Sequence, residues 1–139
     1  MSWGKINENG VICEFNNQRF VHPFLFKDNK VRGYIFYNMN DEIQLTYFSD
    51  SDRIYHKNSD EIFWFDEIDD NLKDKTVLNR QNLSITSIRI DSVSSEKTII
   101  RSGQCEVFKE KRFHTKLVKL KSKYQIELDK TLKDKKNKI

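Results

Sequence analysis

Short β-prone runs separated by turn residues occupy most of the chain. Runs such as "VICEF", "YIFY" and "EIQLTYF" are rich in β-branched and aromatic residues, and Asn, Asp, Gly or Ser stand between them. Residues of the first kind favour strands, whereas those of the second kind favour turns. The sequence therefore predicts a mainly β (α+β) fold. We expect a small barrel or a curled antiparallel sheet at the N-terminus, a further β segment and a basic C-terminal helix.

Turn signals divide the first half of the chain into short strands. Asn9-Gly10 predicts a hairpin turn because both residue types tolerate positive φ, and Asn16-Asn17 predicts a second turn. Pro23 has no amide hydrogen for a β-ladder, so it marks an edge or a bend in its strand. Residues 27–33 are expected to form a loop, and residues 66–75 an acidic loop or a short helix.

The C-terminal segment is expected to be helical. Its apolar residues recur at intervals of three or four, which places them on one helix face: Phe113, Leu117, Leu120, Tyr124, Leu128 and Leu132. A strand alternation is also present, but the length of the run and its Lys, Glu and Gln content favour a helix. We divide the chain into a β-barrel-like region, residues 1–75, and β segments with the basic helix, residues 76–139. Whether the two form one domain is left open.

Charge is distributed unevenly along the chain. Residues 41–74 hold 11 acidic and 3 basic residues, a net charge of −8, whereas residues 101–139 hold 13 basic and 5 acidic residues, a net charge of +8. A basic segment can attract phosphates or an acidic partner, and an acidic segment repels phosphates. The two segments could also face one another.

The two cysteines, Cys13 and Cys105, lie far apart in apolar runs and form no CxxC pair. They are expected to be buried, reduced thiols of a cytoplasmic protein. No metal or other cofactor is expected, because the three histidines have no zinc-ligand spacing. No apolar run is long enough to span a membrane, and the N-terminus lacks the apolar core of a signal peptide.

The first third of the chain resembles a cold-shock domain, a five-stranded OB-type barrel that binds single-stranded RNA or DNA. Gly4-Lys5-Ile6 matches the start of that family's first strand, "RFVHPF" (19–24) its aromatic third strand, and "NDEIQLTYF" (40–48) its fourth. Val11 and Cys13 stand where the family's second strand carries aromatic rings. The resemblance covers residues 3–48 and implies a nucleic-acid-binding barrel with a depleted stacking face.

Strand alternation places Phe20, His22, Phe24 and Phe26 on one face. Such a face is either a core face or a stacking face for bases. We predict a non-enzymatic protein that recognises single-stranded RNA or DNA, with no cofactor. The predicted contact residues are Lys5, Arg19, Phe20, His22, Phe24 and Lys27.

Two other functions fit parts of the sequence. A protein-binding inhibitor or adaptor could use the acidic segment Asp50–Asp74 as its surface, and the alanine-free composition is typical of AT-rich bacterial and phage genomes. "RSGQCEVF" (101–108) resembles the segment that carries the catalytic glutamate of DNA-targeting ADP-ribosyltransferase toxins, which would be Glu106 here.

Phe63, Trp64 and Phe65 are expected in the core. His56 and His114 are expected at the surface.

Overall fold

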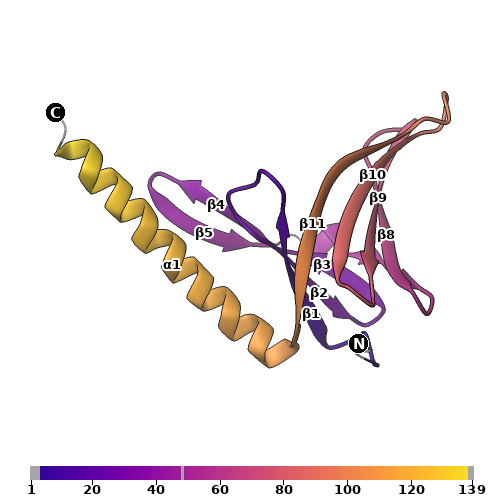
Figure 1. The fold of residues 1–139 in the computed structure, drawn as a ribbon, viewed down its shortest axis with the longest axis horizontal. Helices are drawn as coiled ribbons and strands as arrows, with labels where there is room; N and C mark the ends of the chain where they lie inside the picture. The colour runs from indigo at the N-terminus through magenta and orange to yellow at the C-terminus, as the bar shows by residue number, and fades with distance from the viewer. Residues whose placement is uncertain (1–3, 48, 138–139) are drawn as a thin grey trace.

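The computed structural model describes residues 4–47 and 49–137. It confirms a mainly β fold, in which a nearly closed antiparallel, barrel-like sheet is followed by one C-terminal helix (Figure 1). The elements are β1 (Asn9–Phe15), β2 (His22–Lys27), β3 (Lys30–Gly33), β4 (Ile35–Met39), β5 (Glu42–Thr46), η1 (Ser49–Ser51), β6 (Arg53–Ile54), β7 (His56–Lys57), β8 (Glu61–Glu67), β9 (Leu72–Asn79), β10 (Ser84–Asp91), β11 (Lys97–Lys109) and α1 (Glu110–Lys136).

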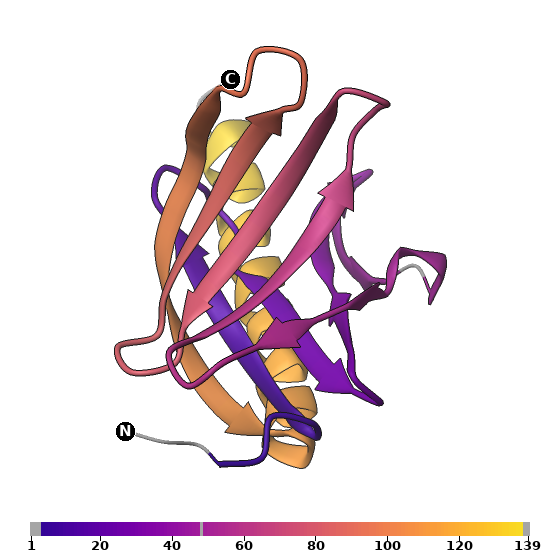
Figure 2. The same ribbon diagram turned by 90° about the vertical axis from the view of Figure 1, so that its right-hand side faces the viewer.

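Within the described residues, nine strands form one sheet in the order β6-β3-β2-β1-β11-β10-β9-β8-β7. The first strand, β1, pairs with the last, β11, along its whole length, from Asn9 opposite Lys109 to Phe15 opposite Gly103. Segments on both sides of residue 75 therefore build a single sheet. The strands at the two ends of this order, β6 and β7, are separated in sequence by Tyr55 alone, so the sheet curls back on itself (Figure 2).

Side chains from the concave face of the sheet fill the inner core. Phe24 and Phe26 of β2 lie against Trp64 of β8, with ring centroids 5.2 and 5.8 Å apart. Such pairs of rings bury large apolar areas and also favour tilted geometries like these. The inner core consists of Ile6, Val11, Cys13, Phe15, Phe24, Phe26, Val31, Tyr55, Ile62, Trp64, Leu78, Ile85 and Cys105.

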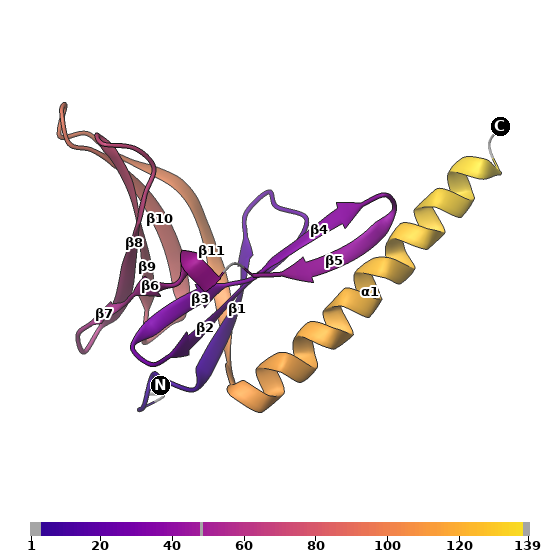
Figure 3. The ribbon, with the colours of Figure 1, turned by 180° about the vertical axis from the view of Figure 1, so that it is seen from behind.

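Helix α1 forms the outer core with the convex side of β1 and β11 and with the β4–β5 hairpin (Figures 1 and 3). Its buried residues are the ones that the helical periodicity predicts, namely Phe113, Leu117, Leu120, Tyr124 and Leu128. Gln125 ties the hairpin to the helix, because its side-chain Oε1 accepts a hydrogen bond from the amide of Ile43 at 2.7 Å. Its Nε2 donates to the carbonyl oxygen of Asp41. The helix prediction is confirmed.

The prediction of a hairpin turn at Asn9-Gly10 is wrong, because both residues lie in β1. The chain turns just before them, at Asn7-Glu8, where Glu8 has a φ of 70°. Gly10 is needed for close packing instead, since a Cβ atom there would collide with the ring of Phe113 from α1. The residue type that signals a turn from sequence here allows the helix to approach the sheet.

Two predicted loops are also shorter than expected. Residues 27–33 form a tight hairpin between β2 and β3, in which Asp28 and Asn29 have φ of 53° and 63°. Most of residues 66–75 belong to strands β8 and β9, with only a turn between them. The predicted turn at Asn16-Asn17 is confirmed.

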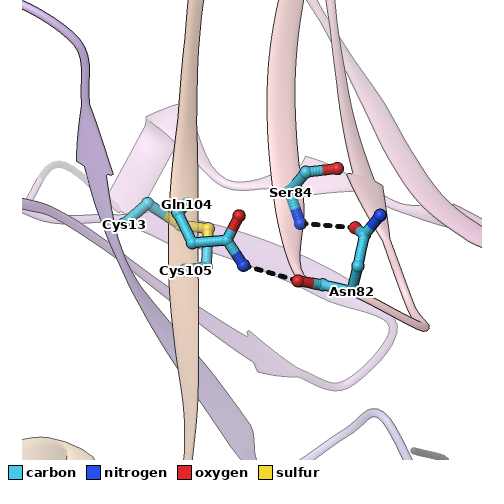
Figure 4. The surroundings of a disulfide bond; sticks show 5 residues. All are labelled: Cys13, Asn82, Ser84, Gln104 and Cys105. Atoms are coloured by element: carbon cyan, nitrogen blue, oxygen red, sulfur yellow. Dashed lines mark hydrogen bonds between the residues drawn. A yellow bond between two sulfur atoms is a disulfide. The ribbon is translucent and has the colours of Figure 1, made fainter.

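Cys13 and Cys105 form a disulfide bond, so the expectation of two reduced thiols is wrong (Figure 4). The two residues are 92 positions apart in sequence but directly opposite each other on β1 and β11. Opposed residues of paired strands share a face, and this pair faces the inner core. Beside it, the side-chain amide of Gln104 donates a hydrogen bond to the carbonyl oxygen of Asn82. The cytoplasmic location loses the support of reduced thiols and stays a prediction.

The first testable prediction concerns Gly10. The Gly10→Ala variant should lose about 1–3 kcal/mol of unfolding free energy, because the added methyl group overpacks the site beneath Phe113. Gly33→Ala is the matched control, since its Cβ would meet only ordinary contacts at 3.6 Å from Phe24. Urea unfolding followed by circular dichroism measures both. Equal stability of the two variants would contradict the proposed packing of α1 on β1.

The second prediction concerns the disulfide. Replacing both Cys13 and Cys105 by Ala should lower the unfolding free energy by about 2–5 kcal/mol, because the bridge closes a long loop of the unfolded chain. Oxidised wild-type protein should show no free thiol with a thiol reagent under denaturing conditions. Two reactive thiols in protein purified without reductant, and no stability change on adding reductant, would contradict the bridge.

Candidate nucleic-acid interface

The aromatic stretch that the sequence singles out does not form one exposed face. Phe24 is buried in the inner core against Trp64. Phe20 precedes β2 and packs on the other side of the sheet, where its ring lies 4.9 Å from that of Tyr124 in α1. The strand begins only at His22, so the alternation expected from Phe20 onward does not hold. These rings stabilise two different cores.

His22 lies between these two positions and is half-buried at the rim of the inner core. Its ring meets that of Phe15 edge-on, and its Nε2 hydrogen-bonds to Oε1 of Gln18 at 2.6 Å. Burial, with a smaller effect of the positive charge of Arg101, lowers the pKa of His22 to about 4. The imidazole is therefore neutral near pH 7 and cannot neutralise a phosphate.

The basic residues of the predicted contact set are exposed but dispersed. Lys5 pairs with Glu8 at 2.9 Å, and Lys27 pairs with Glu110 of α1 at 3.1 Å. Arg19 lies over the ring of Phe20, with its Cζ 5.1 Å from the ring centroid. The six predicted residues thus belong to several surfaces, and the structure does not bring them together into one stacking platform.

Exposed rings and basic groups do meet elsewhere, on the convex face of β7, β8 and β9. We define the outer aromatic strip as His56, Phe63, Phe65, Lys73 and Lys75. His56 and Lys73 are exposed, and the other three are half-buried. Strand pairing brings these residues together, because His56 is opposite Phe63 and Phe65 is opposite Lys75.

The rings of the strip form a continuous array. His56 stacks on Phe63 with centroids 5.2 Å apart and an interplanar angle of 23°, and Phe63 meets Phe65 edge-on at 5.9 Å. Lys75 Nζ lies 4.5 Å from the centroid of Phe63, and Lys73 Nζ lies 4.7 Å from that of Phe65. Both ammonium groups therefore interact with ring faces that water can reach.

The sequence does contain a signal for this site, because side chains alternate between the two faces of the strand "EIFWFDE". Ile62 and Trp64 point into the inner core, so Phe63 and Phe65 point outward. The expectation that all three aromatics lie in the core is correct only for Trp64. Since neighbouring side chains of a strand point to opposite faces, three consecutive aromatics could not all face one core.

The face of the strip continues onto β10 and β11 as an apolar surface. Ile88 is opposite Lys75 on one side and Ile99 on the other, and Ile99 is 65% exposed. Two carboxylates, Glu61 and Glu67, lie at the ends of β8 on the same face. The centre of the surface therefore carries rings and cations, and its negative charges are at the edge.

Helix α1 presents a second, separate basic surface. The helix holds ten basic and four acidic residues, a net charge of +6. All ten basic residues are exposed: Lys111, Arg112, Lys116, Lys119, Lys121, Lys123, Lys130, Lys133, Lys135 and Lys136. Helix α1 and strand β8 lie on opposite sides of the molecule (Figures 1 and 3). The helix exposes no phenylalanine, tyrosine or tryptophan ring and only the isolated imidazole of His114, so it offers mainly charge.

The acidic segment Asp50–Asp74 does not form one continuous negative surface. Three of its aspartates are paired with arginines: Asp52 with Arg32 at 3.1 Å, Asp66 with Arg53 at 3.0 Å and Asp74 with Arg89 at 2.9 Å. The remaining carboxylates are distributed over turns and strand ends. These pairs are internal, so they reduce the charge that the segment can offer to a partner.

The other residues singled out from sequence lie apart from the strip. Glu106 is exposed on β11 opposite Ile12, at a cavity of about 320 Å³ between the sheet and α1. Two lysines of the helix, Lys116 and Lys123, line the same cavity. His114 is exposed on α1, with its Nε2 3.8 Å from a carboxylate oxygen of Glu110.

The third prediction follows from the pKa of His22. Between its ordinary value of 6.5 and about 4, the unfolded chain binds a proton that the native protein does not. Stability should therefore be full above the ordinary value and fall as the pH drops, by up to about 3 kcal/mol from this one group. Urea unfolding near neutral pH and near pH 4.5 should show a smaller acid loss in His22→Gln than in wild type. Equal losses would contradict the buried, neutral imidazole.

Comparison of the chain with protein-family models, curated proteins and solved structures found no match. Among the residues that the structure describes, no helix is both long and apolar enough to cross a bilayer. Within residues 4–47 and 49–137, His, Cys, Asp and Glu side chains form no group of three or more that could hold a metal ion. The outer aromatic strip is therefore identified as the candidate interface from the structure alone.

Proposed function

We propose that the protein is a non-enzymatic, cytoplasmic nucleic-acid-binding protein that recognises single-stranded RNA or DNA through the outer aromatic strip. The observation that carries this proposal is the array of His56, Phe63 and Phe65 with Lys73 and Lys75 on one open sheet face. Bases stack on accessible rings at about 1–3 kcal/mol each, and basic side chains follow the phosphate backbone. A sheet face with both is the combination that this binding mode requires.

The lysines of the strip have a clear part in such binding. In the free protein their ammonium groups lie over the rings of Phe63 and Phe65. A base that stacks on a ring would displace the ammonium group, and the long lysine side chain could then reach a neighbouring phosphate. Cation–π contacts at exposed sites are worth about 0.5–1 kcal/mol, less than the stacking of a base.

The proposal keeps the function that the cold-shock resemblance implies and moves its site. In that resemblance the contact residues lie on "RFVHPF", but here Phe24 is buried and Phe20 packs under α1. The OB-type barrel stays part of the proposal. The strip uses the convex face of β7 to β9, with the basic face of α1 as a secondary source of non-specific attraction.

The fourth prediction tests the strip by fluorescence anisotropy with labelled oligouridylate and oligothymidylate. The Phe63→Leu, Phe65→Leu double variant should bind at least about tenfold more weakly, because it removes two stacking rings but keeps apolar bulk. The Lys73→Gln, Lys75→Gln variant should reduce the slope of log Kd against log salt by about 1–1.5, because two phosphate contacts are lost.

Two variants serve as controls for this experiment. Lys111→Gln with Lys119→Gln removes two charges from α1, and His22→Gln alters a half-buried predicted contact that lies outside the strip. Both should bind within about twofold of wild type at moderate salt. Wild-type affinity in the phenylalanine variant, or a loss seen only with the helix variant, would overturn the strip as the binding site. If the wild-type protein binds neither oligouridylate nor oligothymidylate, the proposed function is wrong.

A further inference from the structure

The inner side of the same strands holds a polar pocket at the mouth of the barrel. Strand pairing aligns Trp64, Thr76, Ser87 and Arg101 across β8, β9, β10 and β11 on the concave face. A cavity of about 310 Å³ opens beside this row. Its floor is formed by two buried rings, Phe24 and Trp64, and its polar lining includes His22, Arg53, Asp66 and Arg101.

Arg101 is held in a fixed position by its neighbours. Its guanidinium Cζ lies 4.1 Å from the ring centroid of Phe15, and its Nε donates a hydrogen bond to Ser87 Oγ at 3.1 Å. Ser87 in turn hydrogen-bonds to Thr76 Oγ1 at 3.0 Å, and both hydroxyl residues are fully buried. Buried hydroxyl groups that orient a charged side chain are typical of a preorganised site.

Among the described residues, Arg101 lacks the carboxylate partner that other arginines of the barrel have. Arg32, Arg53 and Arg89 each form a salt bridge with an aspartate at 2.9–3.1 Å. No described carboxylate lies within 4.0 Å of the Arg101 guanidinium. Its planar donors on the side away from Ser87 are therefore available to an acidic ligand.

The charges around the cavity favour an anion. Arg53 is neutralised by Asp66, and burial keeps His22 neutral near pH 7. Burial also lowers the pKa of Arg101, and the negative charges of Asp66 and Asp74 offset part of this effect. A half-buried cation gains strongly from a charge-assisted, bidentate hydrogen bond to an anion.

We propose that this pocket binds a small organic anion, in which a carboxylate or phosphate group pairs with Arg101 and a flat apolar body contacts Phe24 and Trp64. The proposal is independent of nucleic-acid binding, because the pocket and the outer aromatic strip lie on opposite faces of the sheet. A cavity of about 310 Å³ is at the small end of the range for ligand sites, and barrel mouths are frequent locations for them. A benzene ring with one acidic substituent matches both the size of this cavity and its lining of one arginine and two aromatic rings.

The fifth prediction tests the pocket by nitrogen-15 NMR of the full chain, titrated with benzoate, with phenyl phosphate and with neutral benzyl alcohol. The side-chain Nε–H signal of Arg101 and the indole N–H signal of Trp64 should shift with both anions. Benzyl alcohol should bind at least about tenfold more weakly, because it cannot form the charged hydrogen bonds. The difference between benzoate and phenyl phosphate identifies which acid group the pocket prefers.

Variants complete the test. Arg101→Gln should weaken anion binding at least about tenfold, and Arg101→Lys should recover only part of it because the planar fork is lost. Arg32→Gln is the matched control, since Arg32 is committed to Asp52 and does not line the cavity. Equal shifts with benzyl alcohol, unchanged affinity in Arg101→Gln, or no shift at millimolar anion would overturn the proposal. The comparison of the three ligands uses the wild-type protein, so it remains a valid test even if a variant does not fold.

Discussion

The antiparallel pairing of β1 with β11 is the contact on which the rest of the structure depends. It joins the first strand of the chain to the last in the middle of the sheet, places Cys13 opposite Cys105, and leads from Lys109 directly into α1. The helix therefore folds back over the strand pair that precedes it, and Gly10 leaves room for its first buried ring. Side chains of this strand pair contribute to both the inner and the outer core, so both cores depend on the pairing.

One strand, β8, gives the molecule two surfaces of opposite character. Trp64 points inward to the floor of the barrel-mouth pocket, whereas Phe63 and Phe65 point outward to the strip. The inner surface is a small cavity beside one arginine that lacks a salt-bridge partner among the described residues, which suits a small anion. The outer surface is open and combines rings with flexible lysines, which suits an extended single strand. Both proposals depend on the same alternation of side chains.

Local features of the fold could be predicted from the sequence, but pairings between distant residues could not. The apolar spacing of α1 and most strand positions follow from short patterns, and the structure confirms them. The disulfide depends on β1 meeting β11, and the burial of Phe24 depends on β2 facing β8, which no local pattern specifies. Gly10 was misread because a glycine needed for packing looks like a glycine needed for a turn. The pocket around Arg101 is lined by residues of six strands and had no local signal.

The central claim is that single-stranded nucleic acid contacts the convex face of β7 to β9. The most direct measurement is a map of backbone amide NMR shifts on adding oligothymidylate to nitrogen-15-labelled protein. Our account predicts that the largest shifts fall on residues 56–75, at and around the outer aromatic strip, with small effects at residues 16–26. Shifts concentrated along α1, or on residues 16–26, would contradict it and would assign binding to the basic helix or to the stretch that contains Phe20 and His22.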